Sequence, residues 1–273
     1  PGKKYRLSFL ISFKVTGVAR VMSRSFTSSD LDGNHFIHNE KWIPEKLWDT
    51  HTPENIHKAE VSLLDVSGKN ADIFIPVNFG YREFWIEGRD FYLNGSRIWL
   101  SCIPLDNAQT GVAMASYGEA KTSLQRLKST GINFMYTHNY DSEPGSHLSF
   151  DEILRAADDT GMLIALSQPH FSAYDWDSPG SDMNNGYAHH AAFYTRVARN
   201  HPSVVFYSTS HNSTGYSQDM NPEQIGTRTR MEPQPGRNVP RAQRAEAIIR
   251  QLDPGRIVYH HSSGNLSSMY TCN

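Results

Sequence analysis

The sequence has little cysteine, no long apolar run and no block of like charges. Cys102 and Cys272 are the two cysteines among 273 residues, which excludes a disulfide framework and leaves the redox compartment open. No stretch of 18 consecutive apolar residues occurs, so a membrane-spanning helix is excluded. The formal net charge is -2, and we therefore expect neither nucleic acid nor a membrane surface as a partner.

Metal-binding cassettes such as His-Glu-x-x-His are also absent, although the chain has 13 histidines. We therefore expect no metal and no cofactor. A zinc-dependent hydrolase built from histidines of several loops is kept as an alternative, because imidazole is a preferred zinc ligand.

The first third of the chain has the pattern of an all-β domain. Residues 5–17 and 57–80 alternate β-branched or aromatic residues with polar ones, and Gly-Lys-Asn at 68–70 predicts a hairpin turn. The opening residues lack a small-residue cleavage site, so we interpret them as a strand and not as a signal peptide. A length of about 85 residues with several strands predicts an immunoglobulin-like β-sandwich, which we assign to residues 1–88.

After Phe91 the pattern changes to alternating strands and helices. The dipeptide Asn94-Gly95 predicts a type I′ turn between two short strands. Apolar periodicity predicts helices over residues 117–130, 150–160, 188–199 and 241–252. Between them lie near-continuous apolar strands typical of a parallel sheet, which we expect to begin at Ile98, Ile132, Met162, Val204 and Ile257.

This alternation predicts a (β/α)8 TIM barrel over residues 89–273. A whole barrel needs eight strands and about 250 residues. The chain provides five such strands, so we expect a barrel truncated after about the fifth strand. Because an open half-barrel would expose a sheet edge, the remainder of the barrel is expected from a continuation or from another chain.

Four short runs at the predicted domain and strand boundaries resemble those of a known family. The runs are Gly80-Tyr81-Arg82, Phe91-x-Leu93-Asn94-Gly95, Asp159 with Gly161-Met162-Leu163-Ile164, and Asn200-His201-Pro202-Ser203-Val204. They resemble glycoside hydrolase family 2, which includes β-galactosidases, β-glucuronidases and β-mannosidases. The resemblance covers residues 40 to 261 or so, and it implies an enzyme that hydrolyses O-glycosidic bonds in an oligosaccharide or polysaccharide.

The catalytic position implied by the resemblance holds an unusual residue. Retaining glycosidases use two carboxyl groups about 5 to 5.5 Å apart, one as acid/base and one as nucleophile. The family places its acid/base in a Trp-Ser-x-x-Asn-Glu run after the fourth strand, which corresponds here to residues 207–212. Asn212 then stands where the glutamate is expected, and an amide does not donate a proton as a carboxylic acid does. The nucleophile belongs on a seventh strand, which the sequence does not include.

Residues just beyond the carboxyl ends of barrel strands face the active-site mouth, and this rule selects the candidate site. We predict His211 and Asn212 as catalytic residues. We predict substrate binding by Asp106, His138, Asn139, His170, Trp176, His260 and His261. His211 titrates near neutrality and is one candidate proton donor. The alternative donors are the carboxylates of Asp175, Asp177, Asp219 and Glu223.

Two further hypotheses about the function remain open, in addition to the zinc-dependent hydrolase. The first is a glycoside hydrolase with a non-standard residue in place of the acid/base glutamate, acting on a carbohydrate substrate. The second is a non-catalytic carbohydrate-binding relative, favoured by Asn212 and by Tyr136-Thr137-His138-Asn139-Tyr140, which lacks the arginine of the family's usual Arg-Thr-Ser-His-Tyr run.

Overall fold

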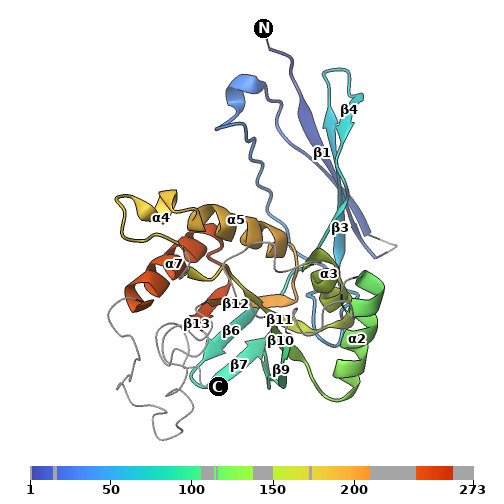
Figure 1. The fold of residues 1–273 in the computed structure, drawn as a ribbon. Helices are drawn as coiled ribbons and strands as arrows, with labels where there is room; N and C mark the ends of the chain where they lie inside the picture. The colour runs from blue at the N-terminus through green and yellow to red at the C-terminus, as the bar shows by residue number, and fades with distance from the viewer. Residues whose placement is uncertain are drawn as a thin grey trace, which may run out of the picture. The chain divides into compact units, whose positions relative to one another are not determined.

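A computed structural model describes residues 2–14, 17–105, 114, 116–137, 150–171, 174–209 and 238–260 (Figure 1). The chain divides into two compact units, residues 1–83 and residues 84–273. Each unit is described by itself. In the described part of the chain, no helix is both long enough and apolar enough to cross a membrane.

The first unit contains one five-stranded antiparallel sheet in the order β2-β1-β3-β4, with β5 also paired to β3. A single-turn 3₁₀ helix, η1 (Ser28–Asp30), lies between β2 and β3. The strands are β1 (Arg6–Phe13), β2 (Gly17–Met22), β3 (His57–Leu64), β4 (Asn70–Ile73) and β5 (Val77–Phe79).

The predicted hairpin after β3 is confirmed. Gly68 adopts φ +82°, and the Asp65 carboxylate accepts hydrogen bonds from the backbone N–H groups of Ser67 and Lys69 at 2.8 and 3.0 Å. A sandwich also needs a second sheet facing the first. The residues described in this unit form no second sheet, so the immunoglobulin-like sandwich stays a prediction.

The second unit begins with a three-stranded antiparallel sheet of β6 (Phe84–Glu87), β7 (Asp90–Leu93) and β8 (Ser96–Ile98). Asn94 and Gly95 have φ +50° and +86°, which confirms the turn with two positive φ angles between β7 and β8. The prediction that a parallel strand begins at Ile98 is wrong. Ile98 pairs with Phe91 in this antiparallel sheet.

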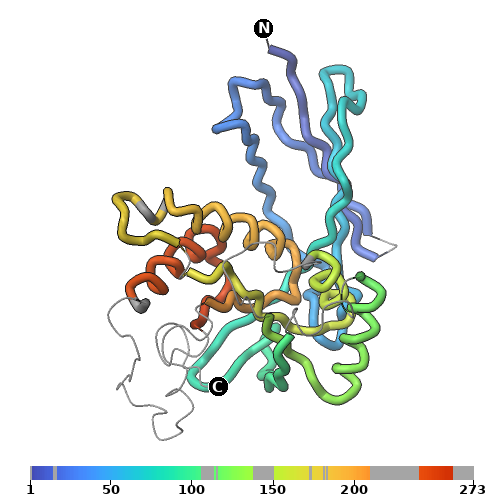
Figure 2. Tube along the Cα trace, viewed as in Figure 1, coloured from blue at the N-terminus to red at the C-terminus, as the bar shows by residue number. Residues whose placement is uncertain are grey.

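Five parallel strands follow, hydrogen-bonded in the sequence order β9-β10-β11-β12-β13. Among the described residues this sheet is open, with β9 and β13 at its edges. Figure 2 traces the alternation of strand and helix along the chain, from green at β9 to red at β13. The strands are β9 (Cys102–Leu105), β10 (Phe134–Thr137), β11 (Leu163–Ser167), β12 (Val204–Thr209) and β13 (Ile257–His260).

The four predicted helices are confirmed, with small shifts of their ends, and a short helix is added before the third. Ser116 caps the first of them, because its side chain accepts a hydrogen bond from the Glu119 backbone N–H. The helices are α2 (Tyr117–Ser129), α3 (Phe150–Thr160), α4 (Ser181–Asn184), α5 (Tyr187–Ala198) and α7 (Asn238–Leu252).

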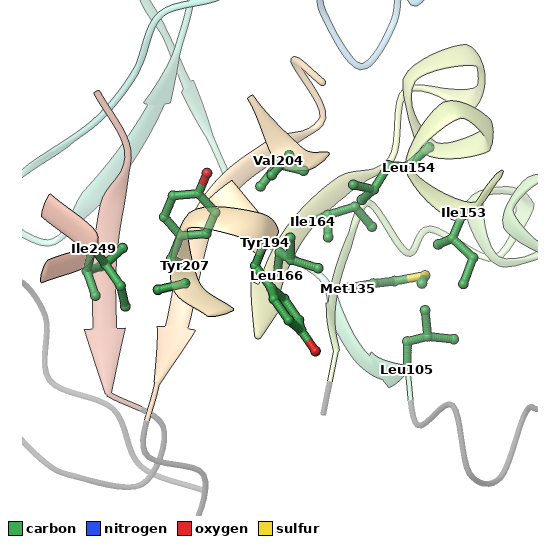
Figure 3. Packing of buried hydrophobic residues seen from close by; sticks show 14 of the residues in the cluster. Leu105, Met135, Ile153, Leu154, Ile164, Leu166, Tyr194, Val204, Tyr207 and Ile249 are labelled. Carbon is green, nitrogen blue, oxygen red and sulfur yellow. The ribbon is translucent and has the colours of Figure 1, made fainter. Parts of the chain in front are cut away.

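One face of the parallel sheet packs against these helices and forms the main core. Met135, Leu166 and Tyr207 project from β10, β11 and β12 toward this layer (Figure 3). Leu154 of α3 and Ile249 of α7 meet them from the helical side, and all of these residues are buried. Burial of this apolar face is the dominant force that orders the sheet.

The opposite face of the sheet holds an aromatic cluster centred on Phe206 of β12. Because successive strand residues point to opposite faces, Phe206 points away from the helices that Tyr207 contacts. Its ring centroid lies 5.7 Å from Phe134, 5.6 Å from Tyr259, 5.1 Å from Phe84 and 6.0 Å from Phe91. Phe84 and Phe91 belong to the antiparallel sheet, so this cluster joins the two sheets of the unit.

The amino-terminal end of β12 is fixed by two buried polar groups. The Arg256 guanidinium donates to the carbonyl oxygens of Val204, Ala198 and His201 at 2.9, 2.9 and 3.1 Å, and it thereby satisfies carbonyl groups at the end of α5. The Asp158 carboxylate lies 2.6 Å from Nδ1 of His201 and accepts the Ser203 backbone N–H at 3.1 Å. Both groups hold the start of β12 in place.

Candidate functional site

The carboxyl ends of the five parallel strands define the edge of the sheet at which a site is expected. The last residues of these strands are Leu105, Thr137, Ser167, Thr209 and His260. Their parallel register places these ends side by side, as in the pairs Leu105 with Thr137 and Thr209 with His260.

Most of the predicted site residues directly follow these ends and lie outside the described residues. They are Asp106, His138, Asn139, His211, Asn212 and His261. Asp219 and Glu223, two of the alternative proton donors, also lie outside the described residues. The catalytic and substrate-binding roles of all these residues stay predictions.

His170 lies three residues beyond the end of β11 and is half-buried. Its ring stacks on Phe171, with centroids 5.4 Å apart and an angle of 12° between the rings. The stacking holds the imidazole close to the carboxyl end of β11. This position is compatible with the predicted substrate contact.

Trp176 was predicted to bind substrate, and the structure places it in the helical layer. Its side chain is buried, and its indole Nε1 donates to the Phe171 carbonyl at 2.7 Å. The Tyr187 ring packs against it with centroids 5.2 Å apart. In this arrangement Trp176 holds the loop after β11 together, and its substrate contact stays a prediction.

Two arginines of α7 hold the same loop from the other side. Arg241 pairs with the Asp177 carboxylate at 2.8 Å. Arg244 donates to the Trp176 carbonyl at 2.7 Å and to Asp182 at 2.6 Å, and its guanidinium lies 5.1 Å from the Trp176 ring centroid. Asp177, an alternative proton donor, is therefore engaged in an ion pair in this arrangement.

Replacement of Arg244 by lysine is expected to loosen this loop. A lysine ammonium does not reproduce the planar fork that bonds Asp182 and the Trp176 carbonyl while stacking on the indole. We expect amide hydrogen exchange across residues 174–184 to accelerate by about tenfold, since charge-assisted hydrogen bonds contribute roughly 1.5 to 3 kcal/mol. Arg196→Lys, at a guanidinium 5.5 Å from the exposed Phe193 ring, is the matched control. Equal rates of amide hydrogen exchange in the two variants would show that Arg244 does not hold this loop.

His260 was also predicted to bind substrate, and the structure shows it with partners inside the chain. It is buried at the end of β13, on the face that packs against the helices. Its Nδ1 lies 2.7 Å from the Thr209 hydroxyl, and its Nε2 lies 2.8 Å from the Glu246 carboxylate. Its contact with substrate stays a prediction.

A row of hydroxyl groups on the sheet face that carries Phe206 was missed by the sequence reasoning. Ser167, Ser208 and Tyr259 share one level of the sheet, because Ser167 pairs with Ser208 and Ser208 pairs with Tyr259. Burial raises the pKa of the Tyr259 phenol, and its hydrogen bond with Ser208 opposes that rise. In a closed barrel this face is the interior. The sequence gives no signal for these positions, because β12 and β13 are apolar on both faces, and the register between the strands identifies them.

The residues that the structure describes contain no set of side chains that could bind a metal ion. No group of three or more His, Cys, Asp or Glu side chains in those residues is arranged to hold an ion. Most of the loop histidines on which the zinc alternative depends lie outside them. The alternative therefore stays untested.

No known family model and no curated protein matches the sequence. Solved structures do match the fold. A β-glucuronidase from Parabacteroides merdae superposes with a TM-score of 0.65 at 17% identity, covering 95% of this chain and 29% of that chain. A β-glucuronidase from Bacteroides uniformis gives a TM-score of 0.67 at 19% identity, covering 95% and 30%. A family 2 β-galacturonidase from Eisenbergiella tayi, bound to galacturonate, gives 0.60 at 17% identity, covering 95% and 41%.

These likenesses establish a shared fold. At these identities they carry no activity from one protein to another. The chain spans 29 to 41% of the length of the three structures, so it corresponds to part of each. Its antiparallel sheets followed by a parallel sheet match parts of those glycosidases.

Proposed function

We propose that the chain forms part of a glycoside hydrolase of the family 2 type, which hydrolyses O-glycosidic bonds in an oligosaccharide or polysaccharide. The observation that carries the proposal is the set of five parallel strands in sequence order, in a chain whose fold matches family 2 glycosidases over 95% of its length. The family-like runs support it by their positions. Asn94-Gly95 forms the turn between β7 and β8, and Asn200-His201-Pro202-Ser203 leads directly into β12.

The finer architecture belongs to the same proposal. We infer that residues 1–88 form an immunoglobulin-like domain and that residues 89–273 form the amino-terminal part of a TIM barrel. The remaining strands would pair with the edge strand β13 and come from a continuation or from another chain. Closure of the barrel would turn the sheet face with Phe206, Ser167, Ser208 and Tyr259 into the interior.

The proposed acid/base step departs from the usual family pattern. β12 ends at Thr209, so His211 and Asn212 follow within three residues of the strand end. We propose that these two residues take the place of the usual glutamate region, with the His211 imidazole as the proton donor to the leaving oxygen and Asn212 as a hydrogen-bond donor to the sugar.

The test is hydrolysis by the full-length protein of a panel of aryl glycosides and oligosaccharides. If His211 and Asn212 act as proposed, His211→Ala and Asn212→Ala each lower kcat/KM, by about 10² to 10⁴-fold for the proton donor. Asn70→Ala, on the exposed edge strand β4, is the matched control and should retain wild-type activity. Turnover that persists in both site variants would reject the assignment of these residues.

A second candidate function is carbohydrate binding without catalysis, which the amide at position 212 favours. It predicts that the full-length protein binds an oligosaccharide, measured by titration calorimetry, while no substrate of the panel is hydrolysed. Hydrolysis that is lost in Asn212→Ala would exclude it.

A further inference from the structure

A hydrogen-bonded series of four polar side chains connects α7 to the end of β12. The series is exposed at Arg250 and buried at His260 and Thr209. Arg250 and Glu246 of α7 pair at 2.6 Å. The second oxygen of Glu246 lies 2.8 Å from Nε2 of His260, and Nδ1 of His260 lies 2.7 Å from the Thr209 hydroxyl. His260 is the last residue of β13, and Thr209 is the last residue of β12.

The imidazole is suited to join these two groups. A carboxylate accepts hydrogen bonds, so Nε2 of His260 carries the proton that it shares with Glu246. Nδ1 then accepts a hydrogen bond from the Thr209 hydroxyl. Both ring nitrogens have partners within the fold, and 1% of the His260 side chain is exposed. Such a buried and fully bonded ring fixes geometry well.

The position of these hydrogen bonds between side chains gives them a functional meaning. Thr209 and His260 are directly paired residues of neighbouring strands. The hydrogen bond between their side chains therefore ties the last pair of the β12–β13 ladder to the helical layer. The chain leaves β12 at this pair and reaches His211 and Asn212 within three residues. A displacement of the end of β12 would therefore also displace the two residues proposed as catalytic.

We propose that His260, held by Glu246, is a positioning residue that sets the end of β12 and thereby the catalytic loop that follows. The inference rests on the proposed function. It replaces the predicted substrate contact of His260, because the ring bonds to Thr209 and Glu246 on the helical side of the sheet. Misplacement of a catalytic group by about 1 Å costs on the order of 10²-fold in rate.

The test compares His260→Leu with His260→Gln in the full-length protein. Leucine removes both hydrogen bonds, whereas the glutamine amide donates to Glu246 and its oxygen accepts from Thr209. We expect His260→Leu to lower kcat by about 10 to 100-fold with KM changed less than about threefold, and His260→Gln to recover most of kcat. A raised KM with unchanged kcat would overturn the positioning role in favour of substrate contact.

Variants of Thr209 provide a second test, which can be used even if His260→Leu does not fold. Thr209→Val removes the hydroxyl and keeps the volume, and it should accelerate amide hydrogen exchange at residues 206–209 and lower kcat, with Thr209→Ser restoring both. Thr195→Val is the matched control, since Thr195 is equally buried but donates to the Ala191 carbonyl within α5.

The outcomes separate the two proposals. Wild-type protein without turnover on any glycoside would reject the proposed function, and the positioning role with it. Wild-type turnover that stays unchanged in His260→Leu and Thr209→Val would overturn the positioning role alone.

Discussion

Phe206→Ala is expected to destabilise the second unit by about 3 to 5 kcal/mol, the range measured for truncation of buried phenylalanines. Phe206 is fully buried, and its ring contacts Phe134, Tyr259, Phe84 and Phe91 at centroid distances of 5.1 to 6.0 Å. Its removal leaves a cavity between the parallel sheet and the antiparallel sheet. Neither sheet can collapse fully into the cavity, because each is fixed by its own hydrogen-bond ladder.

The measurement is urea unfolding, followed by far-UV circular dichroism and by tryptophan fluorescence. Phe193→Ala is the matched control, because the Phe193 ring on α5 is 43% exposed. This variant should lose less than about 1 kcal/mol in free energy of unfolding. A loss below about 1 kcal/mol for Phe206→Ala would show that the two sheets do not depend on this ring.

Local chemistry explains why much of this unit is predictable from sequence. Asn94-Gly95 predicts its turn because both residues tolerate the positive φ angles that the turn needs. The helices α2, α3, α5 and α7 are predictable because their apolar residues recur at helical spacing, and because glycine or polar residues mark the helix ends. In each case the signal lies within a few residues of the feature, so tertiary contacts are not needed to find it.

The first parallel strand was misplaced because its signal is weak. The run Ser101-Cys102-Ile103-Pro104 contains a proline, which lacks a backbone N–H and usually argues against a strand interior. In the structure Pro104 lies within β9, at an edge of the described sheet, where one side of the strand has no neighbour. The apolar residues near Ile98 belong instead to the antiparallel sheet that packs on Phe206.

The direction of side chains at the strand ends could not be read from the sequence. β12 and β13 are apolar on both faces, so alternation of hydrophobicity does not say which residues point toward the helices. The sequence therefore does not show that the His260 ring meets Glu246, which is 14 residues earlier on α7. The predicted substrate contact of His260 stays a prediction. Ser208 and Tyr259, on the other face, carried no signal of their own. Only the register between strands identifies both sets.

Asp158→Asn is expected to cost about 3 to 5 kcal/mol at about pH 6, because it leaves the buried His201 imidazolium without its closest counter-charge. Burial lowers the pKa of His201, but hydrogen bonds and charges from Asp151 and Asp158 outweigh it and raise the pKa from 6.5 to about 9. Asp158 lies 2.6 Å from Nδ1, and Asp151 lies 3.8 Å from Nε2. The same Asp158 carboxylate accepts the Ser203 N–H, so its loss also loosens the start of β12.

The raised pKa of His201 gives this prediction a definite pH dependence. The stabilisation is complete below the unfolded-state pKa of about 6.5 and is lost as the pH rises through about 9, because the neutral imidazole no longer attracts the carboxylates. Urea unfolding of wild type and Asp158→Asn at about pH 6 and about pH 9.5 should therefore show a difference that shrinks at the higher pH.

Asp90→Asn provides the control for the change from carboxylate to amide. Asp90 pairs with Arg97 at 2.8 Å, with 31% and 46% of their side chains exposed, so its loss should cost less than about 1 kcal/mol at either pH. A difference between wild type and Asp158→Asn that is equally large at both pH values would contradict a charged His201. In that case the carboxylate would act on β12 through its hydrogen bonds alone, since the acceptance of the Ser203 N–H does not depend on the charge of the ring.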